Sequence, residues 1–148
     1  MFLKLFAVVF VSLFNFLSGC QSVDVEPDSY QTSVDNTYWK LIELNGETVD
    51  FKDGQTREAY FQLVTDGLTV RGFGGCNNFS GRYQLNNDKL TFGPLMSTRM
   101  FCQNTMDLER QFLSVLKDFQ YYSIDQDVLI FFSSNETPIA RFKAVYFN

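Results

Sequence analysis

The chain contains no histidine among its 148 residues, and only 3 cysteines and 3 prolines. Without histidine it lacks the commonest general base, the commonest transition-metal ligand and any triad that depends on imidazole. Basic side chains are also scarce, with 12 against 17 acidic ones and a net charge of −5. Because such a chain repels phosphate backbones, we expect no nucleic-acid partner. The composition favours a protein that binds or holds over an enzyme, with no cofactor and no metal.

The chain is otherwise typical of a folded protein. It is 45% hydrophobic, 17% aromatic and 20% charged. These fractions exclude a disordered or low-complexity chain, and the length corresponds to about one domain.

The first 20 residues, MFLKLFAVVFVSLFNFLSGC, are predicted to be a secretory signal peptide. Lys4 precedes an apolar run over 5–17, which is shorter than the roughly 20 apolar residues that span a membrane. The tetrapeptide Leu-Ser-Gly-Cys at 17–20 resembles the bacterial lipobox, which implies cleavage before Cys20 and lipidation of its thiol. The alternative is an ordinary cleaved signal peptide with an incidental cysteine.

Residues 21–36, QSVDVEPDSYQTSVDN, are polar and acidic and are predicted to form a flexible tether. A tether of this length spans on the order of 20–25 Å. Gln21 follows the cysteine where an aspartate would retain the protein at the inner membrane, so we expect an outer-membrane anchor facing the periplasm. The predicted organisation is a signal peptide over 1–20, a tether over 21–36 and one domain over 37–148.

Short β-forming runs separated by turn residues dominate the domain. Asn45-Gly46 and Asp66-Gly67 are hairpin signals. The last run alternates apolar and basic residues, which is typical of a strand with one wet face. The predicted strands cover 38–44, 59–65, 68–73, 79–85, 89–92, 128–132 and 139–146.

One segment has helical periodicity and predicts a helix over 105–119. Asn104 is the expected N-cap, and Asp107 places negative charge near the positive end of the helix dipole. We expect an α+β fold, mainly antiparallel β, in which this helix packs against a curved sheet or half-barrel. The apolar positions that share one face of the helix are Leu108, Phe112, Val115, Leu116 and Phe119.

Three motifs in chain order carry a resemblance to a known family. They are the tryptophan strand that runs into Asn-Gly at 39–46, GGCNNFSG at 74–81, and STRMFC at 97–102 before an acidic helix. Together they resemble the META domain family of HslJ-like bacterial lipoproteins over about 37–146. The positions that carry the motif are Trp39, Gly75, Cys76, Asn77, Gly81, Thr98, Met100 and Cys102.

The resemblance implies an antiparallel β architecture with one helix, often on an envelope lipoprotein, and a link to heat shock and envelope stress. It brings no established catalytic activity. Half-barrels of this kind are also similar to pilot lipoproteins, which bind an acyl chain or the tail of a secretin.

The glycines at 72, 74 and 75 do not form a phosphate-binding loop. A P-loop requires Gly-Lys-Ser/Thr at its end, whereas Cys76 and Asn77 follow here, and strands are predicted on both sides. We expect a bulge or tight turn in which glycine supplies positive φ and Asn77 and Asn78 share the strained geometry.

Cys76 and Cys102 are the two cysteines that remain if Cys20 is lipidated. An oxidising compartment and an even remainder predict a disulfide. Two alternatives stay open: buried free thiols, or a reactive thiol activated by Arg99. Two cysteines without histidine do not complete a metal site.

The acidic side chains are interpreted as a solvated surface rather than a pair of catalytic carboxylates. Most lie at predicted turns or on wet faces: Asp50, Asp53, Asp66, Asp88, Asp125 and Asp127.

Aromatic residues are unusually numerous, with 17 phenylalanines and 7 tyrosines. In the adjacent pairs 121–122 and 131–132, one ring faces away from the other within a strand. The alternatives are a compact aromatic core, or exposed rings that form a groove or an interface. Replacement of Tyr122 or Phe131 with serine is expected either to abolish complex formation or to empty a ligand pocket.

We therefore expect a non-catalytic envelope lipoprotein, held on the membrane by lipid on Cys20, whose domain binds another envelope protein. The alternative is a carrier of a lipid or other hydrophobic ligand, or a pilot-like chaperone of an outer-membrane protein.

Overall fold

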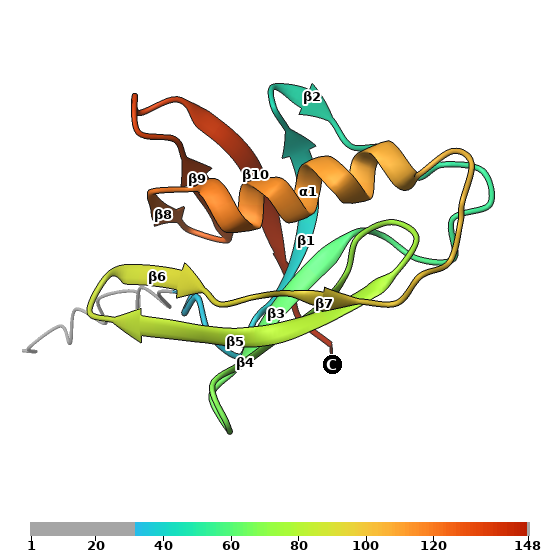
Figure 1. The fold of residues 1–148 in the computed structure, drawn as a ribbon. Coiled ribbons are helices and arrows are strands. Elements are labelled where there is room, and N and C mark those ends of the chain that lie inside the picture. The colour runs from blue at the N-terminus through green and yellow to red at the C-terminus, as the bar shows by residue number, and fades with distance from the viewer. Residues whose placement is uncertain (1–31, 148) are drawn as a thin grey trace, which may run out of the picture.

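The computed structural model describes residues 32–147, which form a curved antiparallel sheet with one helix (Figure 1). The main path of the sheet runs β6-β5-β4-β3-β1-β10-β9-β8, with β2 paired to β1 and β7 paired to β5. This arrangement confirms the predicted α+β class. The elements are β1 Tyr38–Leu44, β2 Glu47–Thr48, β3 Tyr60–Val64, β4 Thr69–Phe73, β5 Asn78–Asn86, β6 Lys89–Phe92, β7 Met96–Ser97, α1 Met106–Asp118, β8 Tyr121–Asp125, β9 Val128–Phe132 and β10 Pro138–Val145.

The turns form where the sequence predicts them. Asn45 and Gly46 have φ angles of 51° and 84°, so this pair forms a left-handed two-residue hairpin between β1 and β2. Gly67 and Asn87 also have positive φ, at the β3–β4 and β5–β6 turns. The strands β2, β7 and β8 were not predicted. Two residues, as in β2 and β7, are too few for a periodic pattern.

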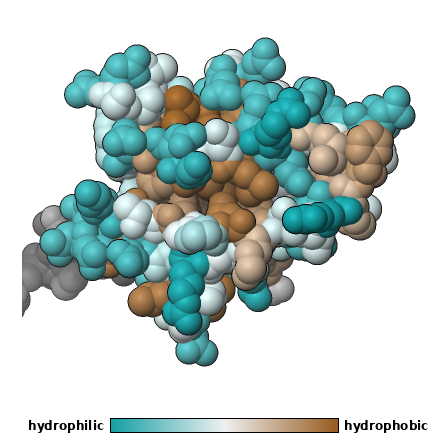
Figure 2. Space-filling model, viewed as in Figure 1, coloured by the Kyte–Doolittle hydropathy of each residue, from teal (hydrophilic) through white to brown (hydrophobic). Residues whose placement is uncertain are grey.

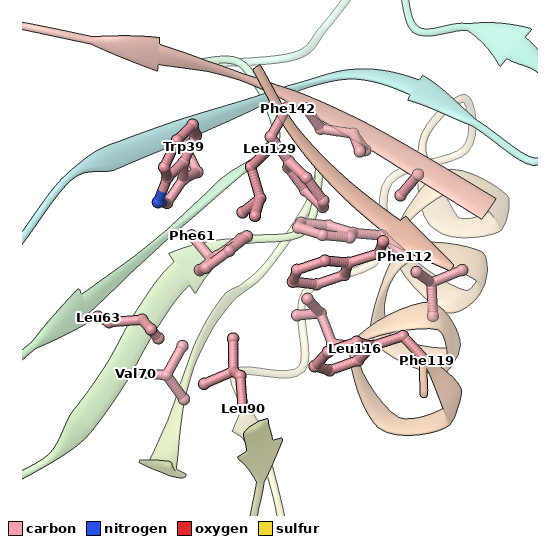
Figure 3. Packing of buried hydrophobic residues seen from close by; sticks show 14 of the residues in the cluster. Trp39, Phe61, Leu63, Val70, Leu90, Phe112, Leu116, Phe119, Leu129 and Phe142 are labelled. Atoms are coloured by element: carbon pink, nitrogen blue, oxygen red, sulfur yellow. The ribbon is translucent and has the colours of Figure 1, made fainter. Parts of the chain in front are cut away.

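The core lies between the concave face of the sheet and α1 (Figure 3). Alternate residues of the strands point inward, as the burial pattern of β3 shows, and the helix adds its apolar face. The rings of Phe61 and Phe142 pack edge to face with centroids 5.0 Å apart. The largest fully buried apolar side chains are Trp39, Phe61, Phe112, Phe131, Phe142, Leu41, Leu63, Leu116, Leu129 and Val70.

The sheet is nearly closed into a barrel. β6 and β8 are the two ends of the strand order and lie near each other. No ladder joins them among residues 32–147. The two strands therefore border an open seam.

The folded domain begins earlier than predicted. Val34 is buried in the core, and its carbonyl accepts a 2.8 Å hydrogen bond from Nε1 of Trp39. The hydroxyl groups of Thr32 and Tyr146 are 2.8 Å apart. Residues 32–36, assigned to the tether, therefore pack on the domain; residues 1–31, which include Cys20, lie outside the described part of the chain. Local composition is polar here, so only the tertiary contacts reveal the packing.

The helix spans Met106–Asp118, in agreement with the prediction, but its N-cap is Thr105 rather than Asn104. Asn104 instead directs its amide toward the carbonyl of Asp53. Thr105 makes no side-chain cap, and its buried hydroxyl has no hydrogen-bond partner in the described structure. Within residues 32–147 no helix has the length and hydropathy needed to cross a bilayer.

Gly72 in the middle of β4 is a position where alanine is expected to be severely destabilising. A Cβ there would lie 2.3 Å from the backbone carbonyl oxygen of Tyr60 and 2.5 Å from the ring of Phe79. We expect Gly72→Ala to lower the free energy of unfolding by about 3 kcal/mol, since two strands must separate to make room. Urea unfolding measures the loss. Gly93→Ala is the matched control, because its Cβ would lie 3.4 Å from its nearest neighbour; equal stability of the two variants would contradict the packing of β4.

Candidate functional site: the disulfide loop

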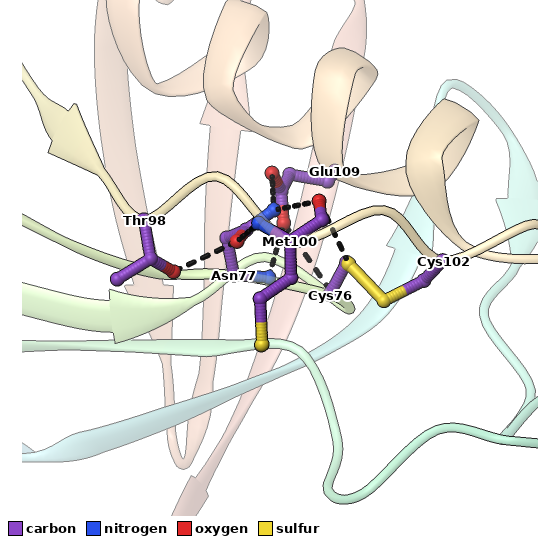
Figure 4. The surroundings of a disulfide bond; sticks show 6 residues. All are labelled: Cys76, Asn77, Thr98, Met100, Cys102 and Glu109. Atoms are coloured by element: carbon purple, nitrogen blue, oxygen red, sulfur yellow. Dashed lines mark hydrogen bonds between the residues drawn. A yellow bond between two sulfur atoms is a disulfide. The ribbon is translucent and has the colours of Figure 1, made fainter.

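The candidate site lies where the β4–β5 turn meets the segment that connects β7 to α1 (Figure 4). Cys76 of the turn forms a disulfide with Cys102, with Cα atoms 5.8 Å apart. The predicted disulfide is therefore present in the structure. We call residues Met96–Cys102 the disulfide loop.

A buried asparagine sets the shape of this loop. The Oδ1 atom of Asn77 accepts hydrogen bonds of 2.7 Å from the Thr98 hydroxyl and 2.7 Å from the Met100 backbone N–H. Its Nδ2 group donates to the carbonyl oxygen of Met100 at 3.1 Å and to Oε1 of Glu109 at 2.9 Å. Because Asn77 is only 2% exposed, water does not replace these contacts. One side chain thus holds both backbone polar groups of Met100.

Glu109 on the first turn of α1 anchors the asparagine from the other side. Its Oε2 atom accepts the backbone N–H of Asn77 at 2.5 Å and that of Cys76 at 3.3 Å. The carboxylate is 6% exposed and lies in the helix turn where the dipole favours negative charge. Three N–H donors and the helix terminus therefore stabilise a buried acid that has no basic partner among residues 32–147.

Two glycines let the turn approach the helix. A Cβ on Gly74 would lie 2.6 Å from Cγ of Glu109, and Gly75 has a φ of +116° that L side chains rarely adopt. The predicted glycine turn is confirmed. The prediction that Asn77 and Asn78 share its strained geometry is wrong, because neither has positive φ and β5 begins at Asn78. Asn77 is required here because its side-chain amide both donates and accepts hydrogen bonds, and not because it adopts a positive φ.

The loop directs large apolar side chains into solvent. Met96 is 72% exposed, Met100 54% and Phe101 82%. In Figure 2 a pale-brown patch bordered by hydrophilic residues lies toward the right of this face, where the loops before β3 and before α1 lie in Figure 1. Arg99, next to Met100, is also exposed. The hydrogen bonds of Asn77 and Glu109, which we call the buried network, thus support a loop surface that is apolar and carries the positive charge of Arg99.

The motif positions divide between this site and the core. Cys76, Asn77, Thr98, Met100 and Cys102 meet around the disulfide (Figure 4), and Gly75 immediately precedes Cys76 in the turn. Trp39 is instead a fully buried core residue on β1. Gly81 allows the segment between β6 and β7 to pass close, since a Cβ there would lie 2.8 Å from Cδ2 of Leu95.

Sequence reasoning missed Glu109, the one buried acid among the described residues. A signal was present, because Glu109 lies three positions before Phe112 and seven before Leu116, on the buried face of the helix. The predicted surface acids are confirmed as solvent-facing: five of the six are exposed and Asp127 is half-buried.

The aromatic pairs divide between the two faces of the sheet, as expected. Tyr121 and Phe132 stack on the outer face with centroids 4.8 Å apart. The choice of Phe131 as a surface position is wrong, because its ring is fully buried against Phe119 and Phe142. Tyr122 is half-buried on β8. The position of β8 at the edge of the sheet could not be predicted from the local sequence pattern.

No metal-binding group emerges from the described residues. Among residues 32–147 no three Cys, Asp or Glu side chains gather closely enough to hold an ion. Cys76 and Cys102 are joined to each other, and the oxygens of Glu109 are occupied by N–H groups.

The fold and this site define a β-rich, single-helix domain with a disulfide-fixed loop. The model of the META domain matches residues 32–146, so the chain belongs to the META domain family. No match was found among curated proteins.

Two solved structures share the fold. An NMR structure of a protein from Burkholderia xenovorans is 24% identical, with a TM-score of 0.62 over 77% of this chain and 85% of that one. A second NMR structure of a protein is 22% identical, with a TM-score of 0.59 over 74% and 90% of the two chains. At these identities the similarity shows the fold alone.

Proposed function

We propose that this protein is a non-catalytic lipoprotein of the cell envelope whose disulfide loop binds another envelope protein. One observation carries the proposal: exposed Met96, Met100 and Phe101 stand on a loop whose backbone is held by a buried network. Large exposed apolar groups that cluster on a monomer usually mark an interaction site. Aromatic and methionine side chains are enriched at the centres of such interfaces.

The rigidity of the loop supports a binding role. Both backbone polar groups of Met100 are bonded to Asn77, and Cys102 is covalently tied to Cys76. A loop that is already ordered loses little conformational entropy on association, so more of the contact energy appears as affinity. The neighbouring Arg99 favours a partner with an apolar pocket and an acidic rim.

The chemistry of the side chains supports the non-catalytic part of the proposal. The whole sequence contains no histidine, and the buried carboxylate of Glu109 accepts hydrogen bonds from three N–H groups. An acid held in this way is a structural anchor rather than a free general base. We propose no cofactor.

The proposed location rests on the N-terminal sequence. Leu-Ser-Gly-Cys at 17–20 marks Cys20 as the lipidated residue, and Gln21 directs the protein to the outer membrane, facing the periplasm. Residues 21–31 would connect the anchor to the domain. In this position the disulfide loop meets envelope proteins, and the family's link to heat shock makes a stress-related role part of the proposal.

Serine substitutions on the disulfide loop are expected to weaken binding of the partner without a loss of stability. Met100→Ser together with Phe101→Ser removes apolar surface that is already exposed, so the free energy of unfolding should change by less than about 1 kcal/mol. Binding should fall at least tenfold, as expected for hot-spot residues. The measurement is photo-cross-linking in intact envelopes from position 101 of the lipidated full chain, with identification of the captured partner and titration of the purified pair.

The control places the same cross-linker at Tyr121, which is 40% exposed on the outer face of β8. We expect the partner at position 101 only, and loss of that product when Met100 is replaced by serine. Capture of the same proteins from both positions would contradict the proposal.

A second candidate function, carriage of a hydrophobic ligand, is favoured by a separate observation. A groove of about 1160 Å³ opens at the other end of β5, lined in part by Val34, Leu85 and Ile124. This volume is sufficient for a ligand, since ligand pockets are typically about 300–1,000 Å³. The two functions use different surfaces and can coexist.

A further inference from the structure

The groove lies between the β5–β6 hairpin, strand β8 and the segment that enters β1. Leu85 and Asp88 contribute from the hairpin, Tyr122 and Ile124 from β8. In Figure 1 these elements surround the left-hand end of the molecule, away from the disulfide loop. Since β6 and β8 form no ladder with each other, the groove continues the open seam of the barrel.

The floor of the groove is apolar. Val34 belongs to the core, and Leu85, Tyr122 and Ile124 pack against it as partly buried side chains. Thr32, Ser33 and Ser123 also line the groove. A hydrocarbon chain fits such a floor, because each methylene that leaves water contributes about 0.8 kcal/mol.

The rim of the groove is negative. Its lining includes Asp88 and Asp127 but no lysine or arginine. Lys143 neutralises Asp127 through a 2.5 Å ion pair, whereas Asp88 forms no ion pair among residues 32–147. Lys89 follows Asp88 in the chain but does not line the groove.

The electrostatic environment of the Tyr122 hydroxyl is consistent with a negatively charged groove. Burial, with the nearby carboxylates of Asp88 and Asp35, raises the pKa of the Tyr122 hydroxyl above its ordinary value. An anionic headgroup would be repelled here, and a cationic one attracted.

We infer that the groove binds a cationic amphiphile, with its hydrocarbon chain against Leu85, Tyr122 and Ile124 and its positive head beside Asp88. This inference rests on the carrier function proposed above and narrows its ligand to one charge class. Neutral and anionic lipids are the alternatives that the experiment separates.

The test uses the chain from Gln21 to Asn148 with its disulfide intact. The probe is dodecyltrimethylammonium below its micelle concentration, and the matched probe is dodecyldimethylamine oxide, which has nearly the same shape but no net charge above neutral pH. Calorimetry measures the affinities. Fluorescence of Trp39 reports the site, because its Nε1 bonds to the carbonyl of Val34, a residue that lines the groove.

We expect the cationic probe to bind about fivefold more tightly than the neutral one. Asp88→Asn should remove that preference and leave the affinity for the neutral probe unchanged. Asp53→Asn, a matched change at an exposed acid outside the groove, should have no effect. Tyr122→Ala should weaken both probes, which places them in the groove.

The experiment distinguishes failure of the inference about ligand charge from failure of the proposed carrier function. Equal binding of the two probes, or a charge preference that survives Asp88→Asn, overturns the inference and leaves the carrier function standing. If neither amphiphile binds, both the inference and the carrier function fail.

Discussion

Replacing Asn77 with alanine is expected to lower the free energy of unfolding by about 3–5 kcal/mol. The side chain makes four hydrogen bonds, to Thr98, to both backbone polar groups of Met100 and to Glu109. Alanine leaves a buried oxygen of the Glu109 carboxylate and the part-buried groups of Thr98 and Met100 without these partners. Chemical unfolding monitored by circular dichroism measures the loss.

Asn78→Ala is the matched control, since Asn78 is the next residue in the chain and its side chain is exposed. We expect it to change stability by less than about 0.5 kcal/mol. Asn77→Asp should be at least as damaging as Asn77→Ala, because it places a second carboxylate beside Glu109. A loss of under 1 kcal/mol for Asn77→Ala would refute the role assigned to the network.

Removing the disulfide is expected to cost about 3–4 kcal/mol while the fold persists. Cys76 and Cys102 are separated by 26 residues, so the bond restricts a long loop of the unfolded chain. The fold persists because the aromatic core between the sheet and α1 is built by other residues. The measurement compares thermal unfolding of the wild type with that of the double variant Cys76→Ser, Cys102→Ser.

A reducing agent supplies the control. It should lower the stability of the wild type to that of the double variant and leave the variant unchanged. If the wild type is equally stable with and without reductant, Cys76 and Cys102 do not form a bond that stabilises the folded protein.

Much of the fold could be predicted because local chemistry and tertiary structure agree. The Asn45-Gly46 pair can adopt the left-handed hairpin that the twist of β1 and β2 requires. The spacing of Phe112, Leu116 and Phe119 predicts the face of α1 that enters the core. In these segments a short window contains the information that determines the structure.

The features that escaped prediction depend on contacts distant in sequence. Thr32 and Val34 look like a polar linker until Tyr146 and Trp39 pack against them. Glu109 looks like an ordinary acid at a helix start until Asn77, 32 residues earlier, donates its backbone and amide N–H groups to it. The sequence predicted the disulfide but not the hydrogen bonds that give the loop its shape.

The proposed interaction surface and the proposed ligand groove lie at opposite ends of β5. Asn78 at the start of this strand follows the disulfide turn, and Leu85 near its end lines the groove. A rigid barrel between the two would let a partner and a ligand bind independently. Variants of the loop and of the groove should therefore have additive effects.

Hydrogen exchange at the backbone amide of Met100 tests the central claim, that an exposed apolar loop is held rigid from within. This N–H donates to the buried Oδ1 of Asn77 at 2.7 Å although the Met100 side chain is in solvent. We expect the amide of Met100 to exchange as slowly as those of β4 and β5, and faster by a factor on the order of a hundred in Asn77→Ala. Exchange of the wild-type amide at the rate of an unstructured peptide would contradict a preformed loop.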